Sequence, residues 1–169
     1  MARVLLVPAA MRRPRRLRPF PQRVVLGAIA GFGGTMVMQG LLTLSGKALP
    51  ASRPPIKQDP AEFMLGKVKE HVKVPEKLEA AAAKSLHLGY GITSGVIYGA
   101  LRNRAGSTFL DGALLGLGVW ASGYLGWLPA THLMPPVTEQ SPQQVIVPIV
   151  NHALFGIAVV AAYDSLMRV

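Results

Sequence analysis

The sequence of 169 residues contains no cysteine, which excludes disulfide bonds, thiolate metal ligands, cysteine nucleophiles and iron–sulfur clusters held by cysteine. Charge is also scarce. Only 15% of the residues are charged, whereas soluble domains usually have about 25%. Nucleophile-elbow, phosphate-loop, HExxH and haem-attachment patterns are absent as well. We therefore do not expect an enzyme.

What the sequence has instead is hydrophobic residues, which make up 50% of it. Charge-free runs cover residues 24–46, 85–101, 112–138 and 140–163. Each run is long enough, at ~1.5 Å per helical residue, to cross or nearly cross a hydrocarbon core of ~30 Å. We therefore predict an all-α membrane protein, a bundle of four transmembrane helices with spans at about 24–46, 84–102, 110–129 and 142–164.

Residues 1–23 form a basic, proline-interrupted tail before the predicted membrane domain, residues 24–169. The arginines of this tail are Arg3, Arg12, Arg13, Arg15, Arg16, Arg18 and Arg23. By the positive-inside rule we expect the tail in the cytoplasm, against anionic lipids, and four spans then return the C-terminus there. No aromatic-interleaved basic stripe accompanies the net charge of +10, so nucleic acid is not an expected partner. A cleaved signal peptide is the alternative interpretation of the tail and first run.

Between the first two spans, the sequence predicts an amphipathic helix at about residues 60–73, lying on the bilayer surface or covering the bundle. Asp59 is placed to cap its N-terminus, and Pro60 occupies the favoured first helical position. At the start of the last span, Ser141 and Gln144 predict a capping box, and Pro148 predicts a kink further along.

Glycines recur at four-residue intervals in the apolar runs, which places them on one stripe of each helix. Small residues at this spacing let two helices approach closely in lipid. The predicted packing glycines are Gly27, Gly31, Gly91, Gly95, Gly99, Gly112, Gly116 and Gly156. Their spacing predicts that the first span packs against the second.

Three aromatic residues, Trp120, Tyr124 and Trp127, gather toward the C-terminal end of the third predicted span. Because Trp and Tyr are enriched at membrane–water interfaces, we expect an interfacial aromatic belt at this position.

Three histidines, His87, His132 and His152, fall in the half of the predicted bundle away from the cytoplasm. Glu139 and Asn151 are near two of them in sequence. Imidazoles with a carboxylate suit a zinc, copper or iron ion, and ionisable groups inside a membrane generally have a function. These five residues are the candidate proton- or metal-binding site. In the alternative interpretation, the histidines form only structural hydrogen bonds and no cofactor is needed; a bis-histidine haem is disfavoured.

Three segments resemble the YagU-like family of small bacterial inner-membrane proteins. They read GAIAGFGGTMVMQG followed by LPASRPP, then LHLGYGITSGVIYG, and finally NHALFGIAVVAAY, with THLMPP as a similar histidine-plus-proline loop. The resemblance implies a multi-span protein of the bacterial inner membrane with an association with acid tolerance. It also implies that His87, His132 and His152 occupy positions where the family places histidine. The arginine-rich tail and the lysine-rich first loop depart from the family pattern.

The leading functional hypothesis is thus a non-enzymatic inner-membrane protein whose outer-side histidines respond to protons or hold a metal ion. One alternative is an accessory or scaffold subunit, or a homo-oligomer, that docks through its glycine-rich helix faces. A third is a small transporter or channel, in which Pro148 and the Asn151–His152 pair would mark a site within the membrane.

Overall fold

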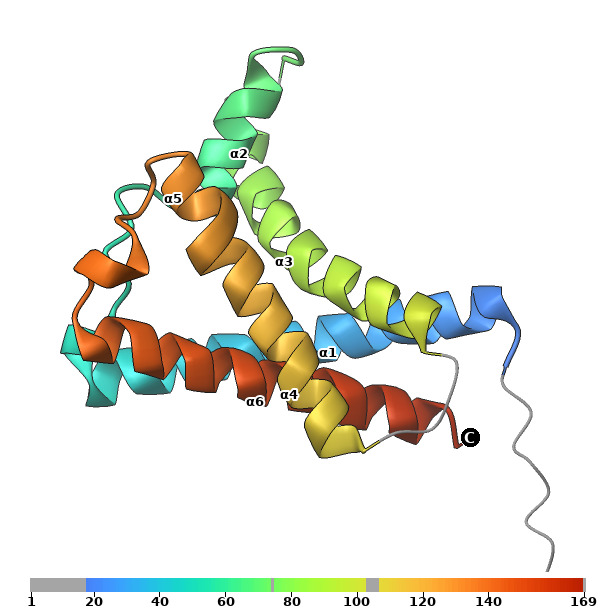
Figure 1. Cartoon of the computed structure of the whole chain (residues 1–169). Helices are drawn as coiled ribbons and strands as arrows, with labels where there is room; N and C mark the ends of the chain where they lie inside the picture. Colours follow the sequence, from blue (N-terminus) through green and yellow to red (C-terminus); the bar gives the residue numbers. More distant parts are fainter. Residues whose placement is uncertain (1–17, 74, 103–106, 169) are drawn as a thin grey trace, which may run out of the picture.

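The structure, a computed structural model, describes residues 18–73, 75–102 and 107–168 (Figure 1). Its elements in chain order are α1 (Phe20–Ala48), η1 (Pro50–Ser52), α2 (Pro60–Lys69), α3 (Glu76–Leu101), α4 (Thr108–Ala121), η2 (Ser122–Trp127), α5 (Leu128–Ala130), η3 (Val137–Glu139) and α6 (Pro142–Leu166). Within those residues the chain forms helices and no strand, so the all-α prediction is confirmed. Most of the predicted basic tail lies outside the described residues.

Two described helices, α1 and α6, are long and apolar enough to cross a membrane by length and composition, where the sequence predicted four such spans. The other two predicted spans differ for separate reasons. In α3 only the part from Leu88 to Leu101 is apolar, because charged residues occupy its first turns. The α4 helix has 14 residues and ends at Ala121, where the wider turns of η2 begin.

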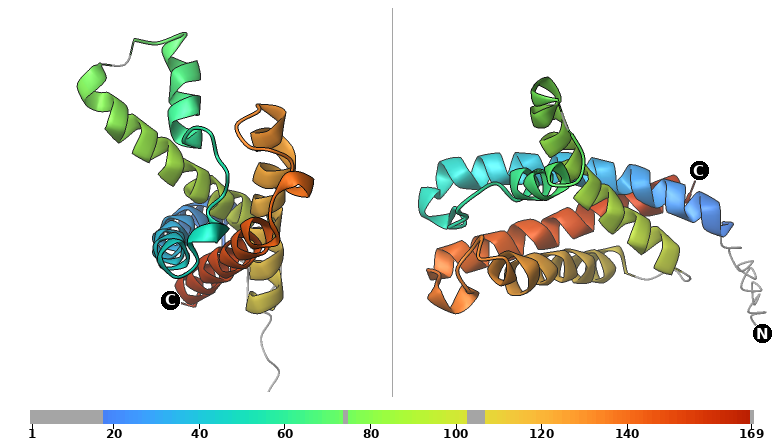
Figure 2. Two further views of the ribbon diagram at one scale, coloured as in Figure 1. Left: turned by 90° about the vertical axis from the view of Figure 1, so that its left-hand side faces the viewer. Right: turned by 90° about the horizontal axis from the view of Figure 1, so that it is seen from above.

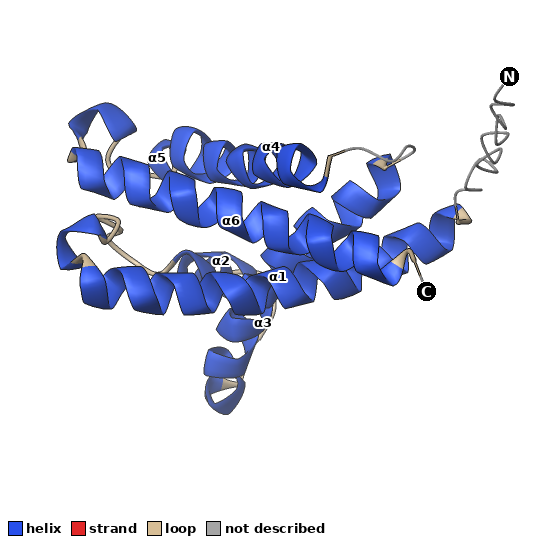
Figure 3. Ribbon diagram, turned by 90° about the horizontal axis from the view of Figure 1, so that it is seen from below, coloured by secondary structure: helices blue, strands red, loops and turns tan. Residues whose placement is uncertain are grey.

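The long helices pack in the order α4, α6, α1, α3; α4, α6 and α1 lie side by side, and α3 crosses α1 and projects away from it (Figure 3). The α1 and α6 helices run antiparallel at the centre of this arrangement. Contact between α3 and α4 is slight, so the four segments do not close into the predicted bundle. The start of α1, the end of α3, the start of α4 and the end of α6 meet at one end of the molecule, which we call the Arg102 end.

The α1 and α3 helices touch through glycine. A methyl group added to Gly31 would lie 2.5 Å from the Gly91 carbonyl oxygen, and one added to Gly95 would lie 2.7 Å from the Gly31 Cα. One turn further toward the Arg102 end, Gly27 and Gly99 approach each other in the same way. The four-residue spacing therefore corresponds to a seam in which the two backbones are in contact.

A second seam joins α4 to α6. A methyl group on Gly112 would lie 2.5 Å from the Ile157 Cα, one on Gly116 would lie 2.9 Å from the Ala153 Cα, and one on Gly156 would lie 2.8 Å from the Gly116 Cα. Two tight helix pairs, α1 with α3 and α4 with α6, are thus the units of the fold.

The helix starts form as their sequences predict. Asp59 accepts hydrogen bonds from the backbone N–H groups of Ala61, at 2.7 Å, and Glu62, at 3.3 Å. In the capping box of α6, the Ser141 backbone N–H donates to the Gln144 side-chain oxygen at 3.0 Å. The α2 helix ends at Lys69, before the expected residue 73.

Substitution of Gly95 by alanine tests the α1–α3 seam. Because the added methyl group would meet α1 backbone that cannot move aside cheaply, we expect Gly95→Ala to lower the free energy of unfolding by about 1–3 kcal/mol. Gly89→Ala, on the same helix but facing open space, is the matched control and should raise stability through helix propensity, by at most about 1 kcal/mol. Circular dichroism during denaturation in detergent measures both. Equal stability of the two variants would contradict the seam.

Candidate functional site

A cavity of about 800 Å³ lies in the half of the molecule away from the Arg102 end. It exists because α3 and the α4–α5 segment diverge from each other beyond that end (Figure 2, left). The α1 and α6 helices form its floor, and α2 lies across it. Its walls are mostly apolar and include Met38, Phe63, Leu86, Trp127, Leu128 and Phe155. Volume and lining are those of a ligand pocket.

One wall of the cavity is η2, a π-helical segment within which Gly126 has φ −103° and ψ −109°. Such wide turns interrupt α-helices frequently at functional sites. Tyr124 of this segment is only 7% exposed, faces the cavity, and forms no hydrogen bond with any residue that the structure describes. Trp120 stacks on Tyr124 with ring centroids 5.7 Å apart. The aromatic residues therefore pack around the cavity, and Tyr124 does not belong to an interfacial belt.

His152 of α6 lies on the cavity floor, half-buried, with its ring edge-on to Tyr124 at 5.8 Å between centroids. Its Nδ1 is 2.7 Å from the Pro148 carbonyl oxygen, one turn earlier in the helix. A carbonyl oxygen only accepts, so Nδ1 carries the proton, and Nε2 of the neutral ring keeps its lone pair. Nε2 has no hydrogen-bond partner among the described residues.

His132 has a different environment. It is exposed, in the turn after α5, and its φ of 59° is the only positive φ outside glycine in the described chain. The His132 N–H donates to the Pro129 carbonyl at 3.0 Å, and the Leu133 N–H donates to the Leu128 carbonyl at 3.0 Å. This is the Schellman arrangement that ends a helix, with His132 at the left-handed position where glycine is usual. The backbone of His132, and not its imidazole, accounts for its place in the fold.

The other candidates lie apart. Glu139 is exposed in η3, and Asn151 is buried on α6, where its side-chain nitrogen donates to Ser45 Oγ at 3.1 Å. The side chain of His87 lies outside what the structure describes. Among the described residues, no three His, Asp or Glu side chains come close enough to hold a metal ion.

Replacing His132 by glycine tests its structural role. Because glycine adopts left-handed φ without steric cost, we expect His132→Gly to stabilise the protein by about 1 kcal/mol, and the β-branched His132→Val to destabilise it by at least as much. Thermal unfolding in detergent measures the difference. If His132→Gly is instead clearly less stable than the parent, the imidazole ring itself contributes to stability, and the purely backbone role of His132 is contradicted.

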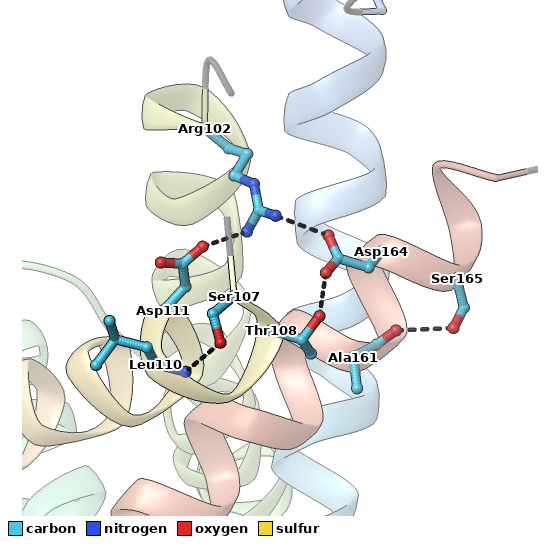
Figure 4. Close-up of polar contacts among 8 residues, drawn as sticks. All are labelled: Arg102, Ser107, Thr108, Leu110, Asp111, Ala161, Asp164 and Ser165. Carbon is cyan, nitrogen blue, oxygen red and sulfur yellow. Dashed lines mark hydrogen bonds and ion pairs between the residues drawn. The ribbon is translucent and has the colours of Figure 1, made fainter. Parts of the chain in front are cut away.

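A polar cluster that the sequence did not reveal closes the Arg102 end (Figure 4). The Arg102 guanidinium pairs with Asp111 at 3.0 Å and Asp164 at 3.2 Å, and Thr108 donates to Asp164 at 2.6 Å. The Arg23 side chain also donates to the Arg102 carbonyl. We call these five residues the Arg102 network. It connects α1, the C-terminus of α3, α4 and α6.

Burial makes this network more than a surface ion pair. The Arg102 side chain is 9% exposed and lies over the Tyr98 ring, 5.1 Å from its centroid, while Asp111 and Asp164 are 30% and 17% exposed. The sequence contained one indication of this network, which was the position of its charged residues relative to the predicted spans. Arg102, Asp111 and Asp164 each stand at the same-side end of a predicted span, so a charge balance at that level could have paired them.

Removing the arginine should therefore cost more than breaking an exposed pair. We expect Arg102→Met, which leaves two partly buried carboxylates without a counterion, to lower the free energy of unfolding by about 3 kcal/mol. Lys67→Met breaks the Lys67–Glu70 pair, whose side chains are 60% and 55% exposed, and should cost less than about 1 kcal/mol.

Chemical denaturation of both variants measures these costs. Neutralising both carboxylates as well, in Arg102→Met/Asp111→Asn/Asp164→Asn, should recover most of the loss. A loss for Arg102→Met no larger than that for Lys67→Met would show that the network is not structural.

Comparisons of the chain with family models, with curated proteins and with solved structures found no match.

Proposed function

We propose that the chain is an integral protein of the bacterial inner membrane, with its four long helical segments crossing the bilayer. The support is the apolar surface that every one of these segments turns outward. Ile29 and Val37 of α1, Ile97 of α3, Leu114 of α4 and Ile146 of α6 are all exposed. Exposing this apolar surface to water would be unfavourable in free energy, whereas contact with lipid hydrocarbon is not.

The same proposal places both termini in the cytoplasm. The first turn of α1 and the last turn of α6 lie at the Arg102 end, as does the junction of α3 and α4. The arginine-rich sequence that precedes α1 favours the cytoplasmic side for this end. The resemblance to YagU-like proteins supports the same location. The cavity with His152 then lies toward the outer side.

Within this protein we propose a non-enzymatic, proton-responsive role, and the observation that carries it is the state of His152. Its Nδ1 is fixed by the Pro148 carbonyl, so a second proton has one place to bind, the unpartnered Nε2 at the cavity. Imidazole is the side chain whose charge ordinarily changes near neutral pH. Among the described residues, the other titratable groups that line the cavity are Tyr124 of η2, Tyr90 of α3 and Asp59 at the start of α2.

Protonation of His152 should change the environment of Tyr124, which its ring contacts, and of Trp120, which stacks on Tyr124. An imidazolium in a mostly apolar cavity is expensive unless the surroundings rearrange, and Tyr124 is in direct ring contact with it. Protons are favoured over a metal ion because the described residues form no group of three His, Asp or Glu side chains that could hold one.

A fluorescence titration tests the proposal. The sequence has two tryptophans, so Trp127→Phe leaves Trp120, stacked on Tyr124, as the single reporter. In lipid nanodiscs, we expect Trp120 emission to change in one proton-binding step between about pH 5 and pH 8. His152→Gln in the same background should abolish the step.

His71→Gln is the matched control, because His71 is exposed on the segment after α2 and does not line the cavity. It should leave the step unchanged. A step that survives His152→Gln with the same midpoint would refute the proton-responsive role.

A further inference from the structure

The cavity contains two polar groups that nothing in the described structure satisfies. The Tyr124 hydroxyl forms no hydrogen bond, although the residue is more than nine-tenths buried, and the His152 Nε2 lone pair is also free. By contrast Tyr90, which also lines the cavity, has its hydroxyl bonded to Ser122 Oγ at 2.9 Å. The two free atoms keep accessible surface at the cavity, so a molecule bound there can reach both of them.

These two groups specify complementary chemistry. Nε2 accepts a hydrogen bond, and a tyrosine hydroxyl can donate one. A hydroxyl on a ligand matches both at once, because its O–H can donate to His152 Nε2 while its oxygen accepts from the Tyr124 hydroxyl.

Charge further restricts the ligand. No Lys or Arg is found among the described lining residues, and the one carboxylate, Asp59, is occupied with the backbone N–H groups that begin α2. While His152 is neutral, a phosphate head would thus find no cation to pair with among these residues and would lose its hydration. The head that this cavity favours is uncharged.

The rest of the cavity favours a hydrocarbon chain. Side chains such as Met38, Leu86, Leu128 and Phe155 form its walls. Tyr90 of α3 lines the cavity and is also exposed at the surface of the molecule, so the cavity reaches the surface beside α3. If the protein lies in the membrane as proposed above, this part of the surface faces acyl chains, so the inference rests on that part of the proposed function.

We propose that the cavity binds a single-chain amphiphile with an uncharged hydroxyl head, a long-chain alcohol, while His152 is neutral. Its head bridges His152 Nε2 and the Tyr124 hydroxyl, and its chain fills the space between α3 and α5.

Brominated probes test this directly, because bromine quenches tryptophan on contact and Trp127 lines the cavity. In a Trp120→Phe background, Trp127 is the single tryptophan. With the full chain in nanodiscs at neutral pH, 12-bromododecanol should quench Trp127 saturably. Tyr124→Phe should weaken binding about tenfold, whereas Tyr90→Phe, which removes a hydroxyl already bonded to Ser122, should change it less than about twofold.

Gly123→Leu is the blocking variant, since Gly123 lines the cavity and a Cβ atom added there would be in ordinary contact with the Leu128 side chain, at 3.8 Å. It should abolish saturable quenching. The tyrosine pair keeps the test decisive even if Gly123→Leu fails to fold. Unsaturable quenching, or equal affinity in Tyr124→Phe and Tyr90→Phe, would overturn the inference.

The nature of the head is tested by two further probes. At a pH above the proton-binding step of His152, 12-bromododecanoic acid and 12-bromododecyl phosphate are both anions, and neither should bind. Tight binding of either anion would overturn the uncharged head. The Trp120 titration is made without a probe, so a failure of the proton response and a failure of amphiphile binding are separate results.

Discussion

Backbone contact between helices at glycine is the constraint on which this structure depends. Where Gly31 and Gly95 face each other, or Gly116 and Gly156, there is no side chain to adjust, so the distance and register of each helix pair are fixed. The α1 and α6 helices join the two pairs, but α3 and α4 each have their small face occupied by their own partner. The remaining glycines Gly89 of α3 and Gly118 of α4 face open space, so they form no seam between these two helices. An open space between them follows directly from the placement of the seams.

The two ends of that space are closed by different interactions. At one end the Arg102 network draws α3, α4 and α6 together around a single guanidinium. At the other end, the chain after α1 and the chain after α5 are tied to each other through the backbone, with the Lys57 N–H donating to the Leu133 carbonyl at 2.9 Å. The cavity is held open between these two closures. Its polar groups, His152 and Tyr124, come from a proline-containing helix and a π-helical segment, where regular helix geometry is interrupted.

Local features of this fold were predictable, and features that depend on long-range contacts were not. The glycine spacing, the Asp59 cap and the Ser141–Gln144 box are each readable within one segment, because helix periodicity and capping are local rules. Closure into a four-helix bundle was the wrong expectation, since hydropathy counts apolar segments and says nothing about which of their faces are already used. The Arg102 network joins residues far apart in the chain, and only the assumed topology placed them at one level.

The histidines show the same division. The sequence indicated that His132 and His152 belong to one half of the molecule, but it could not distinguish a residue needed for its backbone from one with an available ring. The positive φ of His132 makes it a helix terminator, whereas the hydrogen bond of His152 to the Pro148 carbonyl leaves one ring nitrogen free. A motif search treats the two histidines alike, whereas their geometry distinguishes a structural residue, His132, from one with a free ring nitrogen, His152.

The tautomer of His152 is the most direct test of this account, and solid-state nitrogen NMR of histidine-labelled protein in bilayers measures it. With the resonance assigned by its loss in His152→Gln, the account predicts a ring protonated at Nδ1 and unprotonated at Nε2 above neutral pH, converting to imidazolium as the pH falls. A ring that carries its proton on Nε2, or one that does not change with pH, would contradict it.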